Sequence, residues 1–176
     1  MLRGELLSRT LGDPEYVSAM QRAALAFSKY RSQLPTIPYA YTRTRLIERP
    51  HFEVVAMQWA AGSVSPIHDH GASRCWVLML EGTLDVENFE RDLDAENTTV
   101  SMRPSGTLKL KRDDIDSRYG PTELHRVINS GSESAYSLQL YAAPITTYNV
   151  FDEHANASRI VTATCDLVID LESLSA

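Results

Sequence analysis

Residues 66–82 read PIHDHGASRCWVLMLEG, and this stretch decides the fold that the sequence predicts. It contains the triplet His68-Asp69-His70, continues into an apolar run and ends at Gly82. On a β-strand, side chains two residues apart point to the same face. Both imidazoles can therefore reach one metal ion while Asp69 points away. A strand carrying HxH, followed by an apolar strand and a glycine turn, predicts a metal site in a β-rich fold.

His125 is a third candidate ligand, because it begins another predicted strand that lies across the lumen of a barrel. An HxH pair alone is also typical of surface histidines, and His51 and His154 are interpreted as such surface residues. Imidazole suits iron, zinc, copper and nickel alike, so the ligand type leaves the metal open. Among the acids, Glu123 is the best candidate for a fourth ligand, whereas Glu81 falls where a turn is expected.

The remaining sequence predicts one domain, residues 1–176, with a helical segment at 1–38 and a small β-barrel or jelly roll at 39–176. A helix is expected at residues 14–31, where Asp13 can cap it and Pro14 occupies the first turn. The prolines of residues 34–38 end the helical pattern. Short β-type runs follow, closely spaced and separated by turn residues. They span residues 39–47, 52–60, 75–80, 83–89, 107–111, 124–129 and 135–142, with a polar loop at 92–98 and a last run, strand or short helix, at 160–171.

Composition excludes several classes of function. The 176 residues carry a net charge of −6, and their basic residues form no stripe that would neutralise phosphates, so nucleic acid is not an expected partner. No apolar stretch is long enough to cross a bilayer, and the first residues contain no secretory apolar region. Two cysteines without a CxxC motif fit a reducing cytoplasm. The oligomeric state stays open, with a monomer compatible with the sequence.

The quoted stretch resembles the first motif of the cupin superfamily, in which a strand carries HxH, a glutamate follows and a glycine closes the hairpin. Cys75 stands where most cupins place the metal-binding glutamate. Gly120-Pro121, His125 and Asn129 match the second motif. The resemblance implies a mainly β fold, the cupin barrel.

More local matches resemble the cysteine dioxygenase family. They occur in the family's order and are Tyr41-Thr42-Arg43, Ser65-Pro66-Ile67-His68-Asp69-His70, Cys75, Leu124-His125-Arg126-Val127 with Asn129, and Ser137-Leu138-Gln139-Leu140-Tyr141. The resemblance implies an enzyme with one non-haem iron(II), held by His68, His70 and His125, that adds both atoms of O2 to the sulfur of a small thiol. Three neutral ligands leave such a site cationic, so that a substrate thiolate supplies the missing anionic ligand.

By the same resemblance, Arg43 pairs with the substrate carboxylate, and Tyr41 lies near the substrate. Tyr141 is the active-site tyrosine, which some relatives join to a cysteine at the Cys75 position through a thioether. From local sequence alone, Arg43 is a surface ion-pair residue, and Cys75 and the two tyrosines are core residues. Those alternatives stay open at this point.

Two positions depart from the family pattern. Many relatives have a histidine where this chain has Gln139, and an amide cannot relay a proton by titrating. Ala142-Ala143-Pro144 replaces a proline that follows the tyrosine in relatives, so a bend there is expected to be absent or shifted. The leading prediction is oxidation of L-cysteine to cysteine sulfinate. The alternatives are a dioxygenase for another thiol, such as 3-mercaptopropionate, and a cupin isomerase or binding module without iron.

Overall fold

Two helices precede the strands in the computed structural model, which describes residues 2–34, 40–93 and 100–171. They are α1 (Leu2–Leu11) and α2 (Pro14–Tyr30), followed by the short 3-10 helix η1 (Arg31–Gln33). The Asp13 carboxylate caps α2 by accepting the backbone N–H of Glu15 at 2.8 Å. The predicted helix at 14–31 is therefore confirmed, whereas α1 was not expected. Leu34 follows η1, and the rest of the predicted break at 34–38 lies outside the described residues.

The strands in the described segments form two six-stranded sheets. The first sheet has the order β12 (Leu167–Val168), β1 (Tyr41–Arg49), β2 (Phe52–Trp59), β9 (Ala135–Ala142), β4 (Arg74–Glu81) and β7 (Ile115–Tyr119). The second has the order β11 (Ala157–Thr162), β10 (Thr147–Asp152), β3 (Ile67–His68), β8 (Leu124–Ile128), β5 (Thr83–Leu93) and β6 (Val100–Lys111). Neighbouring strands are antiparallel except for the parallel pair β1 and β12.

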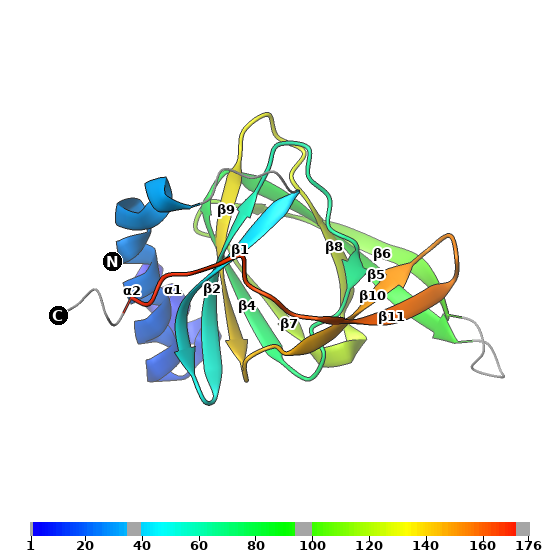
Figure 1. Cartoon of the computed structure of the whole chain (residues 1–176), viewed down its shortest axis with the longest axis horizontal. Helices are drawn as coiled ribbons and strands as arrows, with labels where there is room; N and C mark the ends of the chain where they lie inside the picture. Colours follow the sequence, from blue (N-terminus) through cyan, green and yellow to red (C-terminus); the bar gives the residue numbers. More distant parts are fainter. Residues whose placement is uncertain (1, 35–39, 94–99, 172–176) are drawn as a thin grey trace.

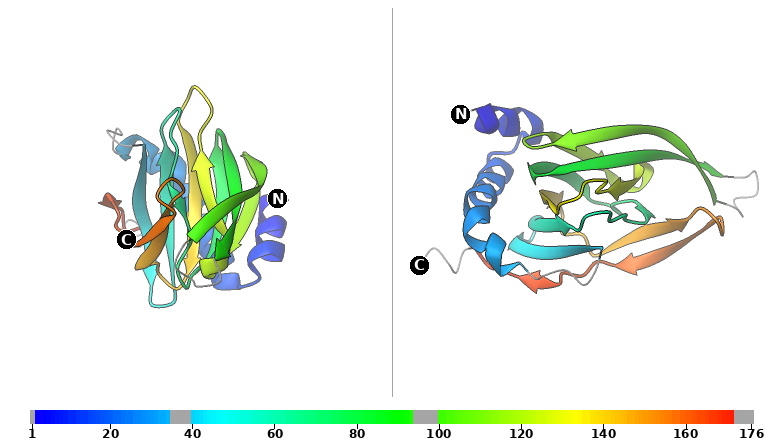
Figure 2. Two further views of the ribbon diagram at one scale, coloured as in Figure 1. Left: turned by 90° about the vertical axis from the view of Figure 1, so that its right-hand side faces the viewer. Right: turned by 90° about the horizontal axis from the view of Figure 1, so that it is seen from above.

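The two sheets face each other as the walls of a barrel, and both helices lie against the outer face of the first sheet (Figures 1 and 2). This arrangement explains why β2 is buried along nearly its whole length. Val54 and Ala56 pack against the helices, whereas Val55 and Met57 point into the barrel. The first sheet is therefore a middle layer with a hydrophobic core on each side. Its inner face lines the interior of the barrel, where a functional site can form.

The mainly β cupin barrel with an N-terminal helical segment is confirmed by this architecture. Several boundaries were wrong. The run at 107–111 is the end of the longer β6, and the run at 160–171 is two short strands, β11 and β12. Residues 92 and 93 continue β5 rather than opening a loop, and 94–98 lie outside the described residues. Strands β7 and β10 were missed because they alternate apolar and polar residues only weakly.

The helices in the described part of the chain are too short or too polar to span a membrane.

Candidate metal centre

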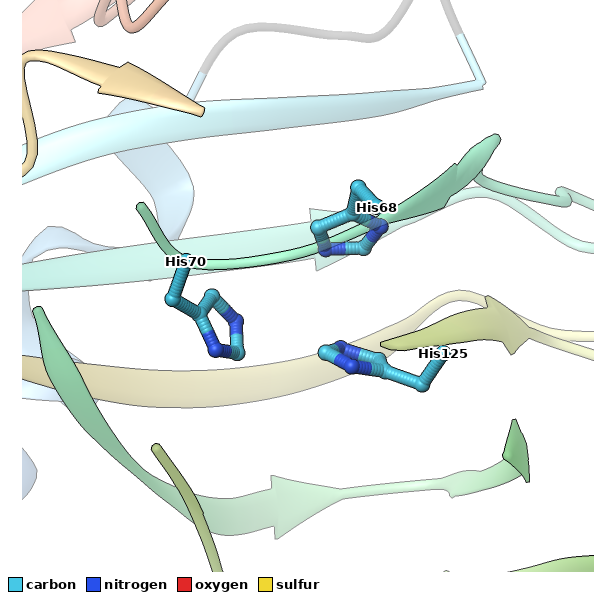
Figure 3. A group of neighbouring side chains, drawn as sticks. All are labelled: His68, His70 and His125. Atoms are coloured by element: carbon cyan, nitrogen blue, oxygen red, sulfur yellow. The ribbon is translucent and has the colours of Figure 1, made fainter. Parts of the chain in front are cut away.

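Three histidines meet inside the barrel. His68 ends β3, His70 follows two residues later, and His125 pairs directly with His68 across β3 and β8. One ring nitrogen from each lies within 4.8 Å of the others, and Figure 3 shows the three rings turned toward one shared space. The strand is shorter than predicted, because it ends at His68, yet the HxH spacing still brings both rings to one point.

The surroundings of the three imidazoles favour their neutral form, which is the form that binds a metal ion. The Nδ1–H of His68 donates to the carbonyl oxygen of Pro66 at 2.9 Å, which leaves its Nε2 lone pair available. Burial lowers the pKa of all three rings, and those of His70 and His125 fall well below the usual value. The buried Nδ1 atoms of His70 and His125 have no hydrogen-bond partner among the described residues. Three convergent neutral rings, two of which have a buried nitrogen without a partner in the described segments, fit a bound metal ion better than a hydrogen-bonded core.

Asp69 does not point toward the metal cluster; its hydrogen bonds hold the backbone between His68 and His70. Its carboxylate is fully buried and accepts the backbone N–H of Gly71 and of Asn149, both at 2.9 Å, and the Asn149 side-chain amide at 2.8 Å. These bonds tie the HxH segment to β10, and they were not predicted from the sequence. They hold the backbone between the two rings in one conformation.

Neither acid considered as a fourth ligand reaches the cluster. Glu123 is exposed and accepts the backbone N–H of Tyr119, while Glu81 forms an ion pair with Arg31 at 2.8 Å. Among the described residues, the group that can hold a metal therefore consists of three histidines. Glu123 was the best acid candidate for a fourth ligand, but its side chain is exposed before β8 begins, and the predicted set of three histidines is the one that converges.

A cavity of about 30 Å³, here called the Arg43 pocket, opens beside the histidines. Its walls include Tyr41 and Arg43 from β1, Tyr141 from β9 and Tyr148 from β10, together with His68 and His70. Arg43 donates from Nη1 to the Tyr141 hydroxyl at 3.4 Å, and its Nε is buried without a partner among the described residues. Its backbone is held by Asp166, whose carboxylate accepts the Arg43 N–H at 2.8 Å. A guanidinium with unused donors beside a metal centre suits an anionic ligand.

Tyr141 connects the Arg43 pocket with Gln139 and Cys75. Its hydroxyl donates to Oε1 of Gln139, two residues away on the same inward face of β9. Cys75 pairs directly with Tyr141 across β4 and β9, and it is fully buried. Burial raises the pKa of both the Cys75 thiol and the Tyr141 phenol. Directly opposite residues in a sheet have Cβ atoms roughly 4.5–5.5 Å apart, so the thiol and the phenol ring are in reach of each other.

The predicted site residues divide between the two sheets. Tyr41, Arg43, Cys75 and Tyr141 come from the first sheet, whereas the three histidines come from the second or directly follow its β3 strand. The sequence did not indicate Trp59, whose indole N–H donates to Ser137 at 3.2 Å, nor the ion pair of Arg118 and Asp116 close to the histidines. The inward alternation of β2 would have indicated Trp59, but the pairing of β7 with β4 had no local signal.

The comparisons with known proteins agree with this geometry. The family model for cysteine dioxygenase type I matches residues 5–154. Cysteine dioxygenase type 1 of Danio rerio is 32% identical over 128 residues, which cover 72% of this chain and 63% of that protein. The protein of the same name from Homo sapiens is 33% identical over 129 residues, with coverages of 72% and 62%. The chain thus spans less than two-thirds of the length of these relatives.

Among solved structures, one from Thermus thermophilus superposes with a TM-score of 0.50 at 16% identity, covering 64% of this chain and 93% of that one. This likeness concerns the fold alone. The sequence match extends over most of the described barrel and includes the histidine cluster and the Arg43 pocket. The chain belongs to the cysteine dioxygenase type I family.

Proposed function

We propose that this chain is an iron(II) thiol dioxygenase that oxidises L-cysteine to cysteine sulfinate. Both atoms of one O2 are added to the thiol sulfur, so no other oxidant or reductant is required. The observation that carries this proposal is the cluster of three neutral histidines beside a cavity that contains a partly buried arginine. Bound iron(II) would lower the pKa of the substrate thiol and bring sulfur and O2 together. The two free cysteines are compatible with activity in the cytoplasm.

Arg43 would bind the substrate carboxylate. The guanidinium is fixed by its bond to Tyr141, and its unpartnered Nε offers a donor for one carboxylate oxygen. A bidentate pair of this kind orients the substrate, so that its thiol faces the histidines. Tyr41 and Tyr148 line the same pocket and would limit the length of the substrate.

Tyr141 would supply a hydrogen bond to the substrate, with Gln139 in control of its direction. In the structure the phenol donates to Gln139 and accepts from Arg43. An amide has a donor as well as an acceptor, so rotation of the Gln139 side chain would reverse the bond and release the phenol proton toward the substrate. Gln139 would act in this way without titrating, unlike a histidine.

The Cys75–Tyr141 pair would form a thioether. This step would join Sγ to a phenol ring carbon, and the two displaced hydrogen atoms would pass to O2 to give hydrogen peroxide, with bound iron supplying the redox chemistry. The direct register pairing of the two residues supports it. Peptide mass mapping after turnover with iron and cysteine should show a fraction of protein lighter by two hydrogens. That fraction should be absent in Cys75→Ser, and an unmodified pair in fully active protein would reject the crosslink.

The decisive test of the activity is O2 uptake by iron-loaded protein with a panel of small thiols. Uptake in step with L-cysteine loss, with sulfinate as product, would support the proposal. Preferred turnover of 3-mercaptopropionate would favour the alternative substrate. That alternative stays open because Gln139 departs from the family pattern. A protein that purifies with zinc, nickel or manganese and consumes no O2 with any thiol would instead be a cupin of another activity.

A further inference from the structure

A second cavity, here called the distal chamber, lies on the other side of the histidines from the Arg43 pocket. It has a volume of about 20 Å³ and lies where β4 and β7 of the first sheet face β5, β6 and β8 of the second. Its aliphatic walls are Val77, Leu84, Val86, Leu110 and Val127. A cavity needs roughly 10–15 Å³ to hold one water-sized molecule, so the chamber takes one small molecule.

The distal chamber and the Arg43 pocket share three wall residues, Trp59, His70 and Gln139. His125 lines only the distal chamber, while His68 lines only the Arg43 pocket. The metal centre therefore stands between two cavities of different character. One is rich in hydroxyl and guanidinium groups, and the other has five aliphatic side chains beside a paired Arg118 and Asp116.

The charged groups in the distal chamber are paired with each other. Arg118 Nε lies 2.7 Å from the Asp116 carboxylate, and Arg118 Nη1 donates to Asn88. The side chains of Arg118 and Asp116 are only 10% and 15% exposed. Gln139 Oε1 is likewise engaged, by Tyr141. A buried water needs two to four polar partners; the Nδ1 atoms of His70 and His125, on the metal side, have no partner in the described part of the chain, but the five aliphatic side chains of the chamber offer none.

We propose that the distal chamber is the site that takes up O2 and passes it to the metal centre. O2 is small and apolar, so it fits against the five aliphatic side chains, which offer a water no hydrogen-bond partner. The role in turnover rests on the proposed function, in which O2 and a charged thiol must meet at one metal. With two cavities, the carboxylated thiol occupies the polar side and O2 approaches from the aliphatic side. The two reactants then do not compete for one pocket.

The first test follows O2 itself and does not depend on turnover. Dissolved O2 is paramagnetic and speeds the relaxation of nearby methyl protons in NMR. Zinc-loaded protein with labelled Val and Leu methyl groups should show several-fold larger O2-induced relaxation at Val86, Val127 and Leu110 than at Leu138 and Leu140. The last two are also buried, but they face the helices on the other side of the first sheet. Equal relaxation at both sets would overturn the proposal.

The second test fills the distal chamber. Val77 is half-buried on β4 and lines the distal chamber but not the Arg43 pocket, so Val77→Phe should occupy the space. We expect the O2 effect at Val86 and Val127 to disappear, and the KM for O2 to rise about 10-fold with the KM for the thiol unchanged. Met57→Phe, on the wall of the Arg43 pocket, is the matched variant and should raise the thiol KM instead.

Leu110→Ala gives a test of opposite sign, in case Val77→Phe does not fold. It enlarges the distal chamber and should increase the O2-induced relaxation of Val86 and Val127; no increase would count against O2 uptake there. If the protein shows the O2 effect but oxidises no thiol, O2 uptake by the distal chamber would be supported and the proposed function rejected. If the protein is active but the O2-induced relaxation is uniform and Val77→Phe leaves the KM for O2 unchanged, only the role of the distal chamber would be rejected.

Discussion

Arg43 is a cation placed at the inner wall of a barrel with part of its bonding capacity unused. We predict that Arg43→Gln raises the KM for L-cysteine about 30- to 150-fold, because it removes a charge-assisted pair with the carboxylate worth about 2–3 kcal/mol. Steady-state kinetics with cysteine and with cysteamine, which lacks the carboxylate, would check this. Cysteamine should show no comparable change.

Arg45→Gln is the matched control, since Arg45 lies on the same strand and pairs with Glu48 at 3.0 Å. Its KM for cysteine should stay near that of the unmodified protein. An Arg43→Gln protein with an unaltered KM would remove Arg43 from the substrate site.

Glu53 is a buried carboxylate whose Oε1 accepts the backbone N–H of Ile145 at 3.1 Å, behind the wall of the Arg43 pocket. Burial raises the pKa of Glu53, and the Ile145 bond and the cations Arg43 and Arg45 oppose the rise, while Glu48 adds to it. Since the folded protein holds this proton more tightly than the unfolded chain, the contribution of Glu53 is favourable below the unfolded pKa. It is lost as the pH rises through the folded pKa.

Glu53→Gln keeps an acceptor for Ile145 and does not titrate. Its free energy of unfolding, relative to the unmodified protein, should therefore increase as the pH rises from about 4 to 7, as measured by urea titration at each pH. Glu48→Gln, at an exposed position, should show no such trend. Parallel pH profiles for Glu53→Gln and the unmodified protein would contradict this interpretation.

At the level of single residues, the sequence indicated the groups whose chemistry follows from type and spacing. The HxH triplet and His125 were found because the HxH spacing on a strand suits a metal and both match the cupin and cysteine dioxygenase motifs, although HxH alone is also typical of surface histidines. Asp69, Arg118 and Asp116 were not assigned roles, because their partners lie on β10, β5 and β7 and depend on how the strands pair.

The turn between His70 and β4 positions the second ligand, and Gly71 makes it possible. Gly71 has a φ of 57°, and a Cβ atom there would lie 2.4 Å from the carbonyl oxygen of Thr147. We predict that Gly71→Ala weakens metal binding about 10-fold, because the turn must move away from β10 and carry His70 with it. Titration with Co(II), followed by absorbance, would measure the affinity.

Gly62→Ala is the control that separates the effect of the steric clash in Gly71→Ala from the effect of backbone strain. Gly62 also has a positive φ, 71°, but a Cβ atom there has no neighbour within 4 Å. Both variants should lose about 1–2 kcal/mol of stability from the left-handed conformation. Only Gly71→Ala should also lose metal affinity, and equal affinities in the two variants would show that the turn does not set the ligand geometry.

The elements that the sequence predicted well are those packed on the middle layer. The helix at 14–31 and the strands near 52–60, 75–80 and 135–142 are buried on at least one face, so their apolar pattern is strong. The edge strand β6 is mostly exposed and contains Pro104 and Gly106, which is why its first half was missed. At the end of β9, Ala143 has a φ of 70°, a conformation closed to proline, so the backbone turn there suits the absence of the proline that the family resemblance led us to expect.

At the level of the whole molecule, metal binding should stabilise the barrel, because the ligands come from segments far apart in the sequence. With free metal at 100 times Kd, binding contributes about 2.7 kcal/mol, or a rise of about 5–10 °C in Tm for a chain of this size. Thermal unfolding with iron(II) under anaerobic conditions, before and after chelation, would measure it. His125→Ala should not respond, whereas His51→Ala, at an exposed position, should respond fully. A full response in His125→Ala would place the metal elsewhere.

The division of the site between two sheets has a consequence for how this protein could diversify. The histidines belong to one wall of the barrel, while Arg43, Tyr41, Gln139 and Tyr141 belong to the opposite wall. If the proposed function holds, heritable changes on the opposite wall would alter which thiol is accepted and leave the three histidines in place. Substrate preference and metal retention would then be separable traits, and a lineage would reach new thiols by small steps while each intermediate still holds its metal.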